Sequence, residues 1–196
     1  MTFVQPIPED DASGELAALY DAQRGPQGHV PNHTRAFSHR PAVYVAWQQL
    51  NAAIKGGMDE RRYELATVAA ARRLRSSYCA LAHGAILADK FLGAEAVSAL
   101  VADHHAADLD PIDVAVMDLA DQVARDATSV TQADIDRLRA LGLSDADVFD
   151  VIAAASARCF FSKALDGLGT QADARFGELE PALRDALTVG RPIAER

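Results

Sequence analysis

The sequence is poor in cysteine and in basic residues, and each shortage excludes a class of protein. Two cysteines in 196 residues are too few for the disulfide framework of a small secreted protein, and a reducing compartment would leave both as thiols. The 19 basic residues are outnumbered by 28 acidic ones, and the formal net charge of -9 would repel a nucleic-acid backbone or an anionic membrane. We therefore expect neither nucleic acid nor a membrane among the partners of this protein.

Long apolar runs are missing as well. The first residues, MTFVQPIPEDDASGEL, lack the basic and apolar regions of a signal peptide, and no apolar run approaches the roughly 20 residues that span a bilayer. We therefore expect a cytoplasmic protein. Hydrophobic residues make up 49% of the chain, which at this length indicates one globular domain whose core needs no metal or disulfide.

Helical periodicity is what the sequence has in abundance. After the first forty residues, apolar positions recur at three- and four-residue steps, and no strand pattern competes with them. Helices are predicted at 14–23, 41–55, 60–75, 76–92, 111–127, 131–141, 144–169 and 179–187, with a long irregular connection at 24–41. The sequence thus predicts an all-α single domain over 1–196, with its core at about 25–170 and about six to eight helices.

Several helix starts have residues that cap a helix. Asp59 precedes one predicted helix, and Asp110 stands before a proline suited to a first turn. Thr131 and Ser144 each begin the Ser/Thr-x-x-acid pattern of a capping box. These signals fix where the predicted helices begin.

The stretch SSYCALAHG combines a cysteine and a histidine at a helix start. If Ser76 or Ser77 is the N-cap, Cys79 falls in the first turn, where unpaired N–H groups and the helix dipole favour a thiolate. His83 follows four residues later, on the same helix face, so that thiol and imidazole can share a proton. The pattern indicates a reactive thiol, whereas an isolated cysteine is more often a packing residue.

Glu64 in the preceding helix is a candidate to orient His83. It borders the apolar stripe that includes Leu65 and Val68, so its carboxylate is expected to face a partner across the helix pair. An ordinary ion pair with Arg61 or Arg62 is the alternative.

Together these positions resemble a known motif. Glu64, Ser76, Cys79 and His83 have the spacing Glu-x11-Cys-x2-Cys-x3-His of the alkylhydroperoxidase D (AhpD) family, within the carboxymuconolactone decarboxylase superfamily, except that Ser76 stands at the first cysteine. The segments VPNHTRAFSHRPAVYVAW and TQADIDRLRALGLSDADVFDVIAAASARCFFSKALDGLG are similar to parts of its peroxidase-related branch. The resemblance covers most of residues 25–170.

The resemblance implies an all-α AhpD-like fold and a thiol-dependent peroxidase acting on organic hydroperoxides or hydrogen peroxide. Cys79 matches the cysteine that attacks the peroxide, His83 the histidine of the proton relay, and Glu64 the glutamate that orients it. Such proteins assemble as trimers or hexamers with the site near subunit contacts, so a homo-oligomer is expected. The chemistry requires no haem, flavin or metal.

Two positions depart from the family pattern. Ser76 cannot resolve a sulfenic acid, so an external thiol or protein reductant is expected, with Cys159 as an internal alternative. Tyr78 replaces a relay residue of some members, and its hydroxyl either donates a hydrogen bond to the departing alkoxide or packs. Cys159 itself lies in an apolar mid-helix stretch, ARCFFS, typical of a packing cysteine.

Two other activities are compatible with the same fold. One is a decarboxylase-like enzyme that makes no use of the cysteine, and the other is a non-enzymatic redox-sensing oligomer in which Cys79 is oxidised once.

Outside the motif, most candidates favour structural roles. His104 and His105 are adjacent, and because neighbouring helical positions face different directions we expect no metal site there. His33 and His39 lie in the irregular connection and are candidates for the mouth of a pocket. The helical stripe of Tyr44, Trp47 and Leu50 is typical of a core or subunit interface.

Overall fold

The computed structural model describes residues 2–25 and 28–195, and the secondary structure of this part of the chain is helical throughout. Its α-helices are α1 (Gly14–Gln23), α2 (Asn32–Ala36), α3 (Pro41–Gly57), α4 (Glu60–Arg73), α5 (Ser77–Leu87), α6 (Ala94–Ala102), α7 (Pro111–Asp126), α8 (Gln132–Ala140), α9 (Asp145–Gly167) and α10 (Pro181–Leu187). No helix among these residues is long and apolar enough to cross a membrane.

The all-α prediction is confirmed, but the described helices exceed the expected number. Two short helices account for the excess. α2 lies inside the connection at 24–41 that the sequence predicted to be irregular, and α6 begins directly after Gly93, whose φ of 81° ends the preceding helical segment. Five residues are too few for apolar periodicity to mark α2. The start of α6 has no capping side chain, whereas α8, which is also nine residues long, begins with a capping box at Thr131.

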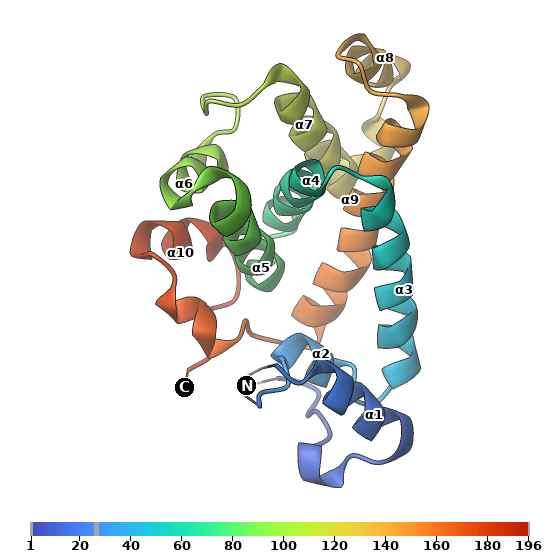
Figure 1. The fold of residues 1–196 in the computed structure, drawn as a ribbon, viewed down its shortest axis with the longest axis vertical. Coiled ribbons are helices and arrows are strands. Elements are labelled where there is room, and N and C mark those ends of the chain that lie inside the picture. Colours follow the sequence, from blue (N-terminus) through green and yellow to red (C-terminus); the bar gives the residue numbers. More distant parts are fainter. Residues whose placement is uncertain (1, 26–27, 196) are drawn as a thin grey trace.

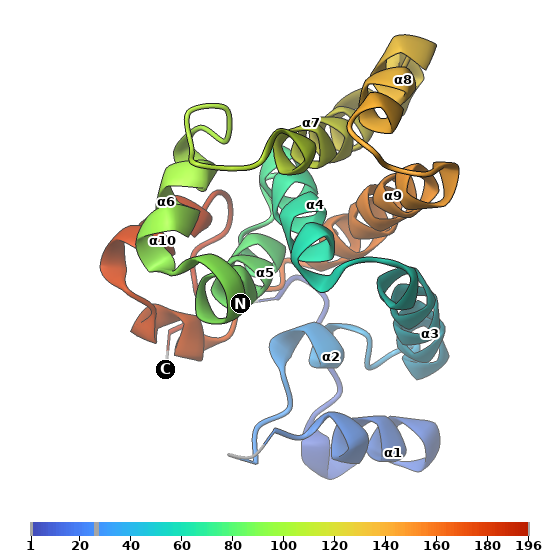
Figure 2. The ribbon, with the colours of Figure 1, turned by 45° about the horizontal axis from the view of Figure 1, so that its top comes forward.

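α4 lies in the middle of the molecule, with α5, α7 and α9 packed around it (Figures 1 and 2). Every residue from Tyr63 to Ala71 is buried, so this helix is enclosed on all sides rather than on one stripe. Most of these residues are small, which lets three neighbouring helices approach the same axis. Glu64 is thereby placed in the interior.

The predicted caps are confirmed at the starts of α4, α8 and α9, and Thr131 and Asp134 form the capping box of α8. Asp110 is the N-cap of α7, but its side chain makes no cap hydrogen bond. The Asp59 side chain accepts a hydrogen bond from the Arg62 N–H at 3.0 Å and begins α4. At the start of α9, Ser144 Oγ accepts from the Asp147 N–H at 3.2 Å, and the Asp147 carboxylate accepts from the Ser144 N–H at 2.8 Å. This is a complete capping box.

The last residues of the chain fasten the start of α5. The Gly190 N–H donates a hydrogen bond to Ser77 Oγ at 2.7 Å, and Arg75 Nε donates to the Val189 carbonyl at 3.3 Å. A Cβ on Gly190 would lie 1.9 Å from the Arg75 carbonyl oxygen. Glycine at this position therefore lets two backbone segments approach closely beside the turn that precedes Cys79.

Replacing Gly190 with alanine should destabilise the protein. Because the clash is with backbone, the C-terminal segment must move, and we expect a loss of about 2 kcal/mol, or a fall in Tm of about 4–8 °C. Thermal unfolding followed by circular dichroism measures it. Gly177→Ala is the matched control, since a Cβ there meets nothing within 4 Å; equal Tm values for the two variants would contradict the close-approach argument.

Candidate active site

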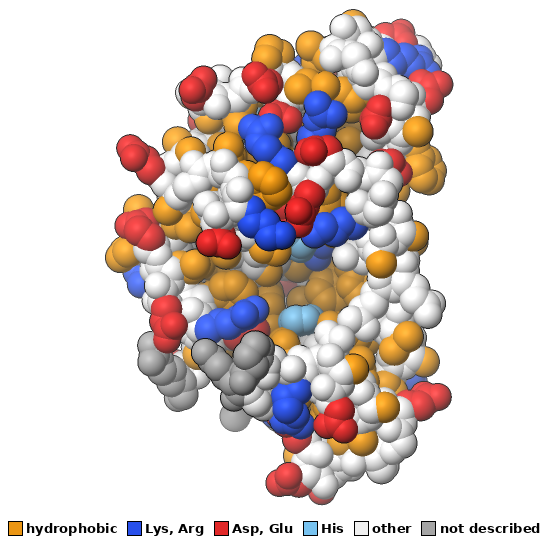
Figure 3. Space-filling model, in the orientation of Figure 1, with side chains coloured by type: hydrophobic (Ala, Val, Ile, Leu, Met, Phe, Trp, Pro, Cys, Tyr) orange, Lys and Arg blue, Asp and Glu red, His pale blue; other side chains and the backbone are white. Residues whose placement is uncertain are grey.

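A cavity of about 220 Å³ lies between α3, α5 and α9, with α2 and the 3-10 turn Ala174–Glu178 completing its wall. Figure 3 shows the molecule hollowed near the middle of this face, with hydrophobic side chains on the floor and histidines at the sides. Aromatic side chains form much of the wall: Tyr44, Trp47, Tyr78, Phe161 and Phe176. The Trp47 and Phe161 rings stack with centroids 4.7 Å apart. Cys79 and His83 both line this cavity.

Cys79 occupies the predicted place in the first turn of α5. Ser76 is the N-cap, and Cys79 is the third helical residue, with 2% of its surface exposed. The hydrogen-bond partner that the structure gives its Sγ is Arg158, whose Nη1 donates at 3.6 Å. We predicted His83 as the group that shares a proton with the thiol. The imidazole lines the same cavity as Cys79, but the hydrogen bond to the sulfur comes from the guanidinium.

Arg158 is a buried cation that sequence analysis missed. It comes from α9, is 3% exposed, and donates from Nη2 to Tyr63 Oη at 3.3 Å. Its guanidinium lies over the rings of Trp47 and Phe161, 5.5 and 5.7 Å from their centroids. Burial alone would lower the pKa of Arg158, but Cys79 and Tyr63 raise it above its ordinary value. Within the described residues no carboxylate forms an ion pair with it.

Glu64 and His83 form the pair that their spacing predicted. His83 Nδ1 lies 2.6 Å from Glu64 Oε2, and Lys55 Nζ lies 3.4 Å from the other carboxylate oxygen. Burial would raise the pKa of Glu64, but His83 and Lys55 hold it below its ordinary value. Burial and then the charge of Arg158 lower the pKa of His83, and Glu64 opposes this only in part.

These shifts define the protonation of the pair at neutral pH. Glu64 is ionised, and His83 is neutral because its pKa lies below the ordinary value near 6.5. The proton on Nδ1 is donated to the carboxylate, so Nε2 carries a free lone pair. An imidazole in this tautomer can accept a proton at Nε2.

A second hydrogen-bond network surrounds Tyr78. Its hydroxyl donates to Asp173 and accepts from the backbone N–H of His33 at 3.1 Å; His33 Nδ1 lies 3.0 Å from the same oxygen. Asp173 also accepts from the Asn32 N–H at 2.8 Å and lies 3.0 Å from His29 Nε2. Since the single hydroxyl proton goes to Asp173, His33 must donate from Nδ1.

This network keeps its titratable groups in fixed states. Burial raises the pKa of Tyr78, and Asp173 raises it further, so the hydroxyl stays protonated. Burial would raise the pKa of Asp173, but its hydrogen bonds, first that from Tyr78, hold it below its ordinary value. Burial lowers the pKa of His33 to about 4, and the imidazole is neutral at pH 7. The cavity thus contains two neutral histidines, each connected to a buried carboxylate.

Of four further residues that the sequence singled out, one lines the cavity and three lie outside its lining. His33 lines the cavity, whereas His39 is exposed and bonds the Gln5 carbonyl. Ser76 and Cys159 do not line it; burial raises the pKa of Cys159. Both cysteines are free.

The aromatic stripe of α3 belongs to the cavity rather than only to the core. Tyr44 and Trp47 are buried and line the cavity wall, while Leu50, which the sequence grouped with them, is 53% exposed. Helical spacing identified the buried face of α3, but the hollow beside that face is formed by other helices.

The histidine pair does not diverge as predicted. His104 and His105 lie in a turn after α6, outside a helix, and the Nε2 atoms of both are 2.9 Å from the same oxygen of Asp118. The nitrogen and carboxylate donor atoms lie within 4.8 Å of one another. Arg137 binds the second oxygen of Asp118 at 2.6 Å, so this carboxylate is already satisfied by three donors.

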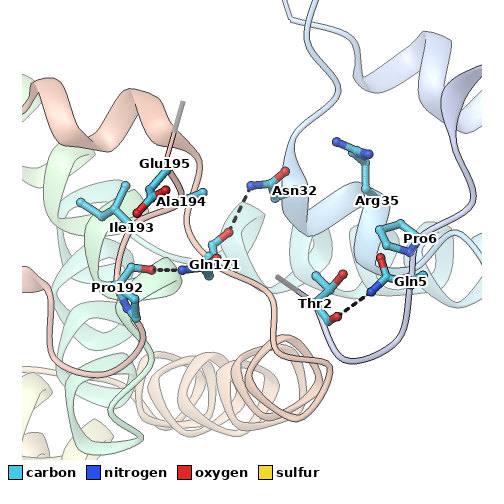
Figure 4. A pocket seen from close by; sticks show the side chains of 10 residues that line it. All are labelled: Thr2, Gln5, Pro6, Asn32, Arg35, Gln171, Pro192, Ile193, Ala194 and Glu195. Atoms are coloured by element: carbon cyan, nitrogen blue, oxygen red, sulfur yellow. Dashed lines mark hydrogen bonds between the residues drawn. The ribbon is translucent and has the colours of Figure 1, made fainter.

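A larger cavity of about 630 Å³ lies between the two ends of the chain (Figure 4). Its wall comes from the N-terminal segment, from α2 and from the C-terminal segment: Thr2, Gln5, Pro6, Asn32, Arg35, Gln171 and Pro192 to Glu195. The Asn32 side chain reaches across to the Gln171 carbonyl at 3.3 Å, and Gln171 donates to the Pro192 carbonyl. None of its lining residues is a cysteine or a histidine, whereas Cys79, His33 and His83 all line the smaller cavity.

Comparison with known proteins supports the fold. No family model matches the sequence, and no curated protein sequence matches it either. Among solved structures, the AhpD core of a peroxidase-related protein from Ralstonia eutropha JMP134 is 23% identical, with a TM-score of 0.79 over 89% of this chain and 94% of that one. A peroxidase-related protein from Silicibacter sp. TM1040 is 19% identical, with a TM-score of 0.77 over 90% and 98% of the two chains.

A third similar structure is a debrominase rather than a peroxidase-related protein. The debrominase Bmp8, in a cysteine-to-alanine form in complex with 2,3,4-tribromopyrrole, is 17% identical, with a TM-score of 0.74 over 95% of this chain and 96% of that one. Identities at this level establish the fold. The fold that the motif resemblance implied is thus confirmed: the chain has an AhpD-like helical fold.

Proposed function

We propose that the protein is a thiol-dependent peroxidase that reduces small hydroperoxides at Cys79. The observation that supports this most is the position of the thiol: it faces a buried guanidinium that has no carboxylate partner among the described residues, next to a neutral histidine held by Glu64. A sulfur atom in such surroundings is stabilised as a thiolate, which is the reactive form of cysteine.

The first step is removal of the thiol proton. His83 accepts it at Nε2, and Glu64, bonded to Nδ1, stabilises the imidazolium that results. Arg158 neutralises the negative charge that appears on the sulfur. The proton therefore moves between two groups of the cavity wall while the total charge of the site is unchanged.

The second step is attack on the peroxide. The thiolate forms an S–O bond with one peroxide oxygen, the O–O bond breaks, and its electron pair leaves on the alkoxide. The imidazolium of His83 returns the proton to that alkoxide, which departs as alcohol, or as water when hydrogen peroxide is the substrate. Cys79 is left as a sulfenic acid.

Regeneration requires two external thiol groups. The first condenses with the sulfenic acid, releasing water and forming a mixed disulfide; the second displaces Cys79 as a thiol and leaves the external pair as a disulfide. Ser76 cannot supply a thiol, and Cys159 does not line the cavity. Both facts favour a small-molecule or protein reductant from outside the chain.

A second candidate function is reductive dehalogenation of a small aromatic compound. The aromatic cavity wall favours it, as does the likeness to a debrominase structure with bound tribromopyrrole. Here the Cys79 thiolate would form an S–Br bond, the aryl carbanion would take a proton, and external thiols would release bromide. The same thiolate and proton donor thus serve either reaction, with a different bond breaking.

The peroxidase proposal predicts that, of the two cysteines, turnover requires Cys79 and does not require Cys159. With cumene hydroperoxide and dithiothreitol, Cys79→Ser should reduce the rate to roughly 1% or less, because the nucleophile is lost. Cys159→Ser is the matched control and should retain turnover. Peroxide consumption is followed by a ferrous-xylenol orange assay, and a dimedone trap identifies the oxidised cysteine by peptide mapping.

Other results of that assay distinguish the alternatives. Activity that survives Cys79→Ser would point to an enzyme that makes no use of the cysteine. Trapping at Cys79 without turnover by any thiol would favour a redox sensor, and equal trapping at both cysteines would contradict activation of Cys79.

The role given to Arg158 predicts slower alkylation when its charge is removed. In Arg158→Met, Cys79 should react with iodoacetamide at pH 7 at least about tenfold more slowly, since a hydrogen bond to a charged group contributes roughly 1.5–3 kcal/mol. Arg158→Lys keeps the charge and should recover part of the rate. Alkylation is measured by intact-mass spectrometry in a Cys159→Ser background, and an unchanged rate in Arg158→Met would exclude the guanidinium as the thiolate partner.

The dehalogenation candidate predicts bromide release from 2,3,4-tribromopyrrole in the presence of dithiothreitol. Release should require Cys79 and should yield a product with one bromine replaced by hydrogen, detected by ion chromatography and mass spectrometry. Release that is equal in wild type and Cys79→Ser would show a background reaction and remove this candidate.

A further inference from the structure

The charged side chains that line the active-site cavity are of one sign. Arg158 and Arg175 both line it, and none of the carboxylates in residues 2–25 and 28–195 does. Glu64 and Asp173 lie outside the lining, bonded to His83 and Tyr78, which separate them from the cavity. This is unusual for a chain whose formal net charge is -9.

The two guanidinium groups differ in their exposure to solvent. Arg158 is buried and contacts Cys79, so its charge is compensated inside the chain only while the sulfur is a thiolate. Arg175 is exposed and lies over the ring of Phe176, 4.9 Å from its centroid. Both guanidinium groups line the same cavity as His33. Burial is the main cause of the lowered pKa of His33, and the charges of Arg175 and Arg158 lower it further. Cavities lined by one sign of charge concentrate ligands of the opposite sign.

The rest of the wall favours a small, flat and largely apolar ligand. Trp47, Phe161 and Phe176 present aromatic surface, and the volume of about 220 Å³ is below the roughly 300–1,000 Å³ of sites for drug-sized molecules. Aromatic surface binds the body of such a ligand, and a guanidinium binds a carboxylate through two parallel hydrogen bonds.

We propose that this cavity selects small aromatic or apolar molecules that carry a carboxylate, with Arg175 binding the carboxylate and the reacting group directed toward Cys79. This proposal rests on the proposed function for the identity of the reaction, because the substrate would be a hydroperoxide with an anionic group. The selection itself is a property of the cavity and is measurable without catalysis.

Trp47 makes binding directly observable. It is the single tryptophan of the chain and belongs to the cavity wall, so its fluorescence reports occupancy. In a Cys79→Ser background, phenylacetate and phenylacetamide are titrated as a pair of nearly equal shape that differs in charge. We expect phenylacetate to bind at least about tenfold more tightly, and the preference to weaken as salt is raised from about 20 to about 300 mM.

Substitutions assign the preference to one residue. Arg175→Gln should reduce the preference to less than about threefold, and Arg175→Lys, which keeps the charge, should retain most of it. Arg125→Gln removes an exposed arginine outside the cavity lining and should leave the preference unchanged. Equal binding of the two probes to the parent protein, or a preference that persists in Arg175→Gln, would overturn the proposal. If Arg175→Gln fails to fold, a preference insensitive to salt in the parent protein would overturn it as well.

A kinetic comparison separates this proposal from the proposed function. With wild-type protein and dithiothreitol, kcat/KM for the para-carboxylate of cumene hydroperoxide should exceed that for cumene hydroperoxide by at least about tenfold, and Arg175→Gln should lower this ratio. Turnover of both peroxides at equal kcat/KM would remove the anion selectivity and leave the peroxidase proposal intact. Absence of turnover with either peroxide, together with the phenylacetate preference, would remove the peroxidase proposal and leave the anion site.

Discussion

The buried guanidinium of Arg158 is the constraint on which the rest of the site depends. An ion that leaves water and lacks an opposite charge costs several kcal/mol, so a fold that buries an arginine must supply compensation nearby. Here the rings of Trp47 and Phe161 and the hydroxyl of Tyr63 give partial compensation. The remaining partner is Cys79. Under the proposed function, a thiolate at this position would complete the charge balance of the buried guanidinium.

The carboxylates of the site are kept one layer behind the reacting atoms. Glu64 is bonded to His83, and Asp173 is bonded to Tyr78. Direct contact between a carboxylate and Arg158 would satisfy the cation and remove its effect on the sulfur. Because each carboxylate reaches the cavity only through a neutral histidine or a tyrosine, it can orient a proton-transferring group without neutralising the guanidinium.

Sequence predicted the parts of this site that are local and missed those that depend on packing. Cys79 and His83 are one helical turn apart, and Glu64 was placed by its relation to an apolar stripe and by the motif spacing, so their arrangement could be anticipated. Arg158 lies 79 residues from Cys79 in sequence. A signal for it did exist, since an arginine inside the apolar run AAASARCFF is costly unless it has a buried partner. Which partner it meets depends on how α9 packs on α5.

The same distinction applies to the helices. Long, capped helices such as α4 and α9 were predicted with nearly correct limits, whereas α2 is too short for periodicity to be visible and α6 begins without a capping side chain. Missing α2 had a consequence for the site, because this helix brings His33 to Tyr78. Residues without a helical pattern of their own can therefore complete a site, and only their tertiary position reveals it.

The structural likeness to both peroxidase-related proteins and a debrominase is understandable from this arrangement. Attack on a peroxide oxygen and attack on a bromine both need a thiolate and then a proton for the departing anion. Under the proposed function, Cys79 and Arg158 would supply the thiolate and His83 the proton, whichever atom the sulfur attacks. Discrimination between substrates must therefore come from the groups that contact the unreactive part of the molecule, namely the aromatic wall and the charge of Arg175.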